Sequence, residues 1–140
     1  MPLGNRNMTG TGGQHQPPLF RLFRLEAPAY KRIFAEKRSF YGRSLTIWVG
    51  RGTDADRRVG VIVSKRTFRR AVDRARAKRL LREAFRLNRH HLAAQVDLIL
   101  IARAGIAGKR CQDVIEDFKQ VCRRAKVWRD DNEPERVAHG

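Results

Sequence analysis

Negative charge is scarce in this chain. The 140 residues hold 14 Asp and Glu against 31 Lys and Arg, which gives a formal net charge of +17. Such an excess of positive charge predicts a polyanionic partner, and nucleic acid is the commonest polyanion inside cells. An anionic membrane surface is the competing partner of the same charge.

Clustered carboxylates, which several kinds of catalysis need, are also missing. A protein nuclease that uses two metal ions would place them beside its polyanion site, whereas Asp73 and Glu83 stand singly among arginines. Asp113, Glu116 and Asp117 are most simply the solvated face of a helix. The HExxH, GxSxG and P-loop patterns do not occur. We therefore expect a polypeptide that binds its partner and does not itself cut it.

Cysteines and long apolar runs are few as well. Cys111 and Cys122 come with neither a CxxC pair nor a histidine at metal-ligand spacing. We therefore expect reduced thiols and no metal site in the protein. No segment approaches the roughly 18 apolar residues that a membrane-spanning helix needs. The first residues lack the apolar core of a secretory signal, which predicts a cytoplasmic protein.

The positive charge is concentrated between Lys65 and Arg89. This stretch has 11 basic residues and two acids, a net of +9 that exceeds half of the whole chain's charge. Its spacing predicts a helix over 71–88 with one buried side, made of Ala77, Leu80, Leu81, Ala84 and Leu87. A solvated basic face is the usual meaning of such a run, but solvated faces mix charges of both signs. We interpret this one as a binding face for phosphates.

The rest of the chain predicts one domain with two tails. Residues 1–18 are rich in Gly, Pro and polar side chains and predict a disordered tail. A single nucleic-acid-binding domain is expected over 19–128 and a flexible polar tail over 129–140. A short amphipathic helix begins near Pro28 and carries Tyr30 and Phe34, which suit either a core or stacking on unpaired bases.

Three strands and a closing helix complete the expected domain. Residues 44–49 alternate, so that Trp48 faces away from Leu45, Ile47 and Val49 and lies either under a helix or on an exposed platform. Residues 58–64 predict the next strand, paired with the first as an antiparallel hairpin. The apolar run 96–102 predicts a central strand, and 111–128 a helix. The order α-β-β-α-β-α, or with one more short strand, predicts an α+β fold with helices packed on a small, mostly antiparallel sheet.

The basic stretch also carries a resemblance to a known family. Val63-Ser64-Lys65-Arg66, followed by the segment from Arg69 to Arg86, resembles the signature of the protein component of bacterial ribonuclease P. The similarity extends from about Arg24 to Lys126. In that family's Arg-Asn-Arg pattern the Asn is replaced here by Ala75, so the resemblance does not imply an amide contact at this position.

The resemblance implies a non-catalytic subunit that binds a large catalytic RNA and assists removal of the 5′ leader from precursor tRNA. Mg²⁺ would be held by the RNA and the substrate, with no obligate protein partner. It also implies a ribosomal-protein-like fold with a left-handed β-α-β crossover. The implied RNA-binding residues are Lys65, Arg66, Arg69, Arg70, Arg74, Arg76, Lys78, Arg79, Arg82 and Arg86. The implied leader-binding cleft consists of Tyr30, Phe34, Thr46 and Trp48.

Three other functions compete with this interpretation. A structural RNA-binding protein of the ribosomal type would have the same charge but would not stimulate leader removal. A helix-turn-helix DNA-binding protein is disfavoured because the basic helix lies between strands, without a partner helix at the required spacing. A protein-only nuclease is disfavoured because the chain lacks clustered carboxylates.

Overall fold

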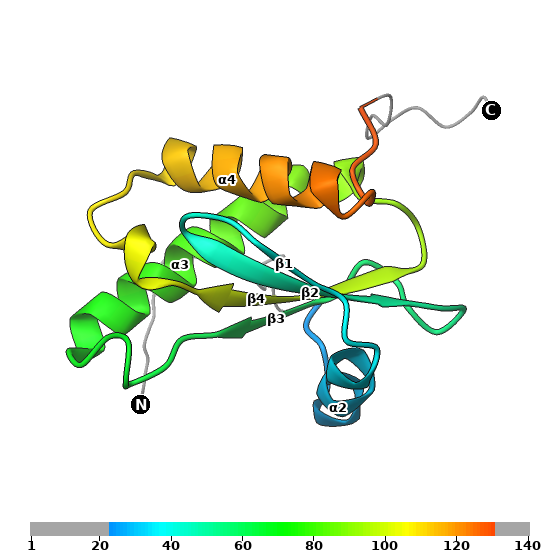
Figure 1. The fold of residues 1–140 in the computed structure, drawn as a ribbon, viewed down its shortest axis with the longest axis horizontal. Helices are drawn as coiled ribbons and strands as arrows, with labels where there is room; N and C mark the ends of the chain where they lie inside the picture. Colours follow the sequence, from blue (N-terminus) through cyan, green and yellow to red (C-terminus); the bar gives the residue numbers. More distant parts are fainter. Residues whose placement is uncertain (1–22, 131–140) are drawn as a thin grey trace, which may run out of the picture.

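The computed structural model describes residues 23–130. Its elements follow in the order α2 (Ala27–Ala35), β1 (Ser39–Tyr41), β2 (Leu45–Arg51), β3 (Val59–Ile62), α3 (Ala71–Asn88), β4 (Val96–Ala102) and α4 (Cys111–Arg124). Helices α3 and α4 cover one face of the four-stranded sheet and α2 lies against the other (Figure 1). The predicted α+β class is confirmed, and β1 is the additional short strand. The tail expected at 1–18 and residues 131–140 lie outside the described residues.

The predicted antiparallel hairpin between residues 44–49 and 58–64, which are β2 and β3 in the structure, is wrong. The sheet order is β1-β2-β4-β3, so β4 lies between β2 and β3. It pairs antiparallel with β2 and parallel with β3. Backbone hydrogen bonds hold the residues just before β3 against β4. Arg57 N–H donates to the Val96 carbonyl at 2.6 Å, and Leu98 N–H donates to the Arg58 carbonyl at 3.0 Å. Strand β4 is therefore central, as its apolar run predicts. The segment β3-α3-β4 is a β-α-β crossover, and its left-handed sense remains a prediction.

The main core lies between the sheet and the pair α3 and α4. Leu45, Ile47 and Val49 point into it, as their alternation predicts, and all three are fully buried. Helix α3 has the predicted bounds, but Leu87 is 43% exposed while Phe85 is buried. The sheet and α4 cover the flank of α3 that carries Phe85 and leave the opposite flank to solvent.

A second, smaller cluster holds α2 on the other face of the sheet. Ile33 is fully buried there against Ile99 of β4. Tyr30 lies so close to Gly60 that a Cβ at this position would collide with the ring. A side chain at position 60 of β3 would therefore push α2 away from the sheet. Glycine at this position allows α2 to pack closely against β3.

Candidate nucleic-acid interface

All four residues of the predicted cleft lie on the sheet face that carries α2. Tyr30 and Phe34 project from α2, and Thr46 and Trp48 project from β2, each half-buried. The rings of Phe34 and Trp48 meet edge to face with centroids 5.0 Å apart and planes at 77°. Trp48 therefore lies beside the helix, at its margin, and keeps part of its indole open to solvent.

The sheet beneath these residues has one covered row and one open row. In the covered row, Trp48 pairs with Ile99, which pairs with Gly60 under Tyr30. Ile99 is fully buried by α2. In the next row, Thr46 pairs with Ile101, which pairs with Ile62, and these three side chains are only half-buried. The open row lies next to the row that α2 covers, and part of each of its side chains is exposed.

The side chain of Tyr30 is partly buried. Partial burial raises the pKa of Tyr30 above its usual value, and the opposing effect of nearby Arg24 is smaller. The phenol is protonated at neutral pH, as an unperturbed tyrosine also is. A protonated phenol can donate a hydrogen bond to a base or a phosphate while its ring remains available for contact.

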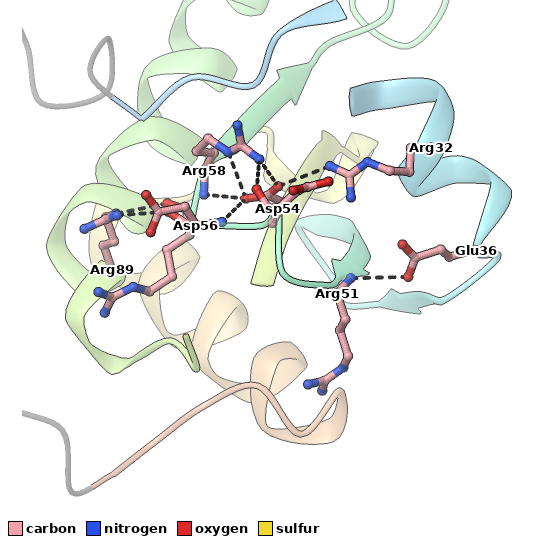
Figure 2. A network of polar contacts seen from close by, with 9 residues as sticks. Arg32, Glu36, Arg51, Asp54, Asp56, Arg58 and Arg89 are labelled. Atoms are coloured by element: carbon pink, nitrogen blue, oxygen red, sulfur yellow. Dashed lines mark hydrogen bonds and ion pairs between the residues drawn. The ribbon is translucent and has the colours of Figure 1, made fainter. Parts of the chain in front are cut away.

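A buried carboxylate that the sequence interpretation missed fixes α2 in place. Asp97 of β4 is fully buried and accepts hydrogen bonds from the Asp56 and Arg58 backbone N–H groups at 3.0 and 2.9 Å. The Arg58 guanidinium binds both of its oxygens, and Arg32 of α2 lies 3.5 Å away. Figure 2 shows Arg32 and Arg58 converging from opposite sides. An acid inside an otherwise apolar strand was the sequence signal for this site.

Other contacts of the same network brace the surrounding loop. Glu36, at the end of α2, accepts a hydrogen bond from the Arg51 backbone N–H at 3.3 Å (Figure 2). Arg89 donates to the Arg57 and Asp56 carbonyls at 2.9 and 3.1 Å. Burial lowers the pKa of Arg89, with the Arg57 charge as a second cause. Helix α2 is thus held at its carboxyl end, through Arg32 in its last turn and Glu36 just beyond it.

The basic residues of α3 and the loop before it divide into two groups. Lys65, Arg66, Arg69, Arg70, Arg79 and Arg86 are exposed, whereas Arg74, Arg76, Lys78 and Arg82 are half-buried. Two of the half-buried guanidinium groups bind the chain itself. Arg74 donates to the Phe68 and Arg69 carbonyls, each at 2.9 Å, and Arg76 donates to the Lys109 carbonyl. These two arginines order the loops at the amino end of α3, so their exposed neighbours are more accessible to a ligand.

The acids on this surface leave most of its charge uncompensated. Asp73 lies 3.7 Å from Arg70, and Glu83 lies 2.7 Å from Arg86. The hydrogen bond from Arg86 lowers the pKa of Glu83, so this pair is charged at neutral pH. Ala75 is exposed in line with Arg79 and Arg82, which places the departure from the family pattern on the outward surface of the helix.

The described residues offer little basis for a metal site or a reactive thiol. No group of three His, Cys, Asp or Glu side chains within residues 23–130 could hold a metal ion. Cys111 and Cys122 are both free, and burial raises the pKa of the Cys122 thiol far above its usual value. Over the same residues, no helix has the length and apolarity that would let it cross a membrane.

Comparison with known proteins identifies the family. A family model described as Ribonuclease P matches residues 22–126. The ribonuclease P protein component of Thioalkalivibrio sulfidiphilus is 43% identical over 90 residues, 63% of this chain and 73% of that protein. The one from an Exiguobacterium species is 36% identical over 99 residues, 71% of this chain and 85% of that protein.

A solved structure agrees with these sequence matches. The RNase P protein of Staphylococcus aureus aligns with a TM-score of 0.65 at 28% identity, over 76% of this chain and 97% of that one. The family model spans nearly all of the described fold, including α2, the basic helix and the central strand that carries Asp97. This chain therefore belongs to the bacterial ribonuclease P protein family.

Proposed function

We propose that this protein, a subunit of the endoribonuclease ribonuclease P, binds two RNA segments at once through opposite faces of its sheet. The basic face of α3 would lie against the catalytic RNA, and the cleft beside α2 would hold the single-stranded 5′ leader of precursor tRNA. The observation that carries the proposal is the separation of the two surfaces, because α3 and α2 cover different faces (Figure 1). Neither surface would block the other.

The two surfaces would contribute different kinds of affinity. Lysines and arginines on α3 bind phosphates without reading sequence, and their contribution falls as salt rises. Aromatic rings in the cleft stack on unpaired bases, each worth about 1 to 3 kcal/mol. The cleft would therefore favour precursor over mature tRNA, since only the precursor has a leader.

The polypeptide would assist the reaction without contributing catalytic groups. The described residues offer no cluster of metal ligands, so we assign Mg²⁺ to the catalytic RNA and the substrate. A metal ion held there would supply an activated water for attack on the scissile phosphate. The protein's cations would reduce repulsion between RNA phosphates and so lower the Mg²⁺ concentration that the RNA requires. This role needs no further protein partner and suits the cytoplasm.

Reconstitution tests this role directly. Cleavage of a precursor tRNA by ribonuclease P RNA is measured over a range of Mg²⁺ concentrations, with and without the protein, and with the protein alone. We expect stimulation that is largest at low Mg²⁺ and no cleavage by the protein alone. An unchanged Mg²⁺ requirement at saturating protein would contradict the proposal and favour a structural RNA-binding protein of the ribosomal type.

The salt dependence of binding tests the assignment of α3 to the catalytic RNA. Arg79→Ala should reduce the slope of log affinity against log salt concentration by about one unit, because one phosphate contact is lost. Arg79 is a cleaner probe than Arg82, whose half-buried side chain would also lose packing. Arg129→Ala, which removes an exposed arginine beyond α4, serves as the control. Equal slopes for the Arg79 and Arg129 variants would remove this face from the interface.

A further inference from the structure

Tyr41 extends the open row of the cleft to the edge of the sheet. It lies on β1 directly opposite Thr46, so the open row runs Tyr41, Thr46, Ile101, Ile62 across all four strands. Its neighbour Phe40 packs into the main core on the opposite face. Because side chains alternate along a strand, Tyr41 projects on the same face as Thr46 and Trp48.

The ring of Tyr41 is open to solvent although its backbone is firmly held. The residue is 59% exposed. Arg103 Nη1 donates to the Gly42 carbonyl at 2.7 Å, and Arg124 donates to the Tyr41 carbonyl. The turn is closed by a hydrogen bond from Gly42 N–H to the Leu45 carbonyl at 2.7 Å. A large exposed ring on a fixed backbone loses little freedom when it binds a planar partner.

The surroundings of this ring favour an anionic, aromatic partner. The Arg103 guanidinium carbon lies 5.4 Å from the Tyr41 ring centroid, within the range of a cation–π contact. Arg43 is exposed in the same turn, and Arg124, at the end of α4, is exposed and reaches the Tyr41 carbonyl. An aromatic ring beside arginines suits a nucleotide, whose base can stack on the ring while its phosphate approaches the cations.

We propose that Tyr41, with Arg103 beside it, is an additional base-stacking position for the 5′ leader, one strand beyond Trp48. This inference rests on the proposed function, because it extends the same cleft. The leader is favoured over the catalytic RNA as the partner of Tyr41 for two reasons. Tyr41 lies on β1, next to the strand that carries Trp48, and it faces away from the side of the sheet that α3 covers. A longer leader would then gain a second stacked base.

Binding of precursor tRNAs with progressively shorter leaders tests this position. Complexes of ribonuclease P RNA with wild-type protein, Tyr41→Ala, Tyr41→Phe and Trp48→Ala are compared, with mature tRNA as reference. Tyr41→Ala should weaken binding of the long-leader precursor about tenfold and leave mature tRNA unchanged. The difference should disappear once the leader is too short to reach β1. Tyr41→Phe, which keeps the ring, should restore most of the affinity.

The outcomes separate this inference from the proposed function. Gln120→Ala removes an exposed neutral side chain on α4, outside both the cleft and the basic helix, and should have no effect on any of these tRNAs. If Trp48→Ala weakens precursor binding selectively but Tyr41→Ala does not, the additional position is refuted and the cleft stands. If neither variant distinguishes precursor from mature tRNA, the leader-binding cleft itself is refuted. Equal losses for both tRNAs in Tyr41→Ala alone would instead place Tyr41 against another RNA surface.

Discussion

Replacing Trp48 with alanine is expected to weaken binding of precursor tRNA to the reconstituted complex about 30-fold and to leave mature tRNA nearly unchanged. Loss of one stacked base costs about 2 kcal/mol, which corresponds to that factor. The indole is half-buried at the margin of α2, with part of its surface available for stacking. Dissociation constants for both tRNAs, measured at one Mg²⁺ and salt concentration, give the comparison.

Two controls separate stacking from packing in this experiment. Trp48→Phe keeps an aromatic ring next to Phe34 and should retain a substantial part of the preference for the precursor. Urea unfolding of each variant shows whether the protein stays folded under the binding conditions. Equal losses of precursor and mature tRNA binding would reassign Trp48 to core packing and remove the basis for a leader site.

Replacing Asp97 with alanine is expected to lower the free energy of unfolding by about 3 kcal/mol. Removing one partner of a buried ion pair costs about 3 to 5 kcal/mol. Here the value should lie at the lower end, because the Arg58 and Arg32 side chains are 31% and 36% exposed and can regain water. The Asp56 and Arg58 backbone N–H groups also lose their acceptor. Urea unfolding at fixed ionic strength measures the change.

A matched pair of variants shows whether burial is the cause. Glu83→Ala removes an acid from an exposed pair with Arg86 and should change stability by less than about 1 kcal/mol. Asp97→Asn keeps an oxygen acceptor for the Asp56 and Arg58 backbone N–H groups. Its loss of stability should therefore lie between those of Glu83→Ala and Asp97→Ala. If Asp97→Ala costs no more than Glu83→Ala, the network around Asp97 does not hold α2 on the sheet.

The parts of the fold that depend on local periodicity could be predicted. The helix over 71–88 has the predicted bounds, because its apolar spacing is regular and extends over five turns. The run 96–102 is central in the sheet because both of its faces are apolar. Alternation likewise assigned Leu45, Ile47 and Val49 to the core.

The pairing of strands could not be predicted from these patterns. Period-two alternation tells which face of a strand is buried, but not which strand lies beside it. Consecutive strands often form hairpins, and this prior gave the wrong partner for β3. The actual neighbour is fixed by contacts between residues about 40 apart, such as Arg58 with Asp97.

The candidate site was predicted unevenly for the same reason. Resemblance placed Tyr30, Phe34, Thr46 and Trp48 together, and the structure brings them to one face of the sheet. Tyr41 was missed because its place beside Thr46 depends on a pairing that the sequence pattern does not specify. Arg74 and Arg76 look like phosphate ligands in the sequence, but both bind backbone carbonyls.

Fluorescence of Trp48 in the reconstituted complex tests the leader-binding cleft most directly. The chain has two tryptophans, so Trp128→Phe leaves Trp48 as the only reporter, and Trp48→Phe leaves Trp128, which is stacked on His91. Precursor tRNA should change the emission of Trp48 strongly, mature tRNA should not, and Trp128 should respond to neither. The same Trp48 signal with both tRNAs, or a response confined to Trp128, would contradict leader binding beside α2.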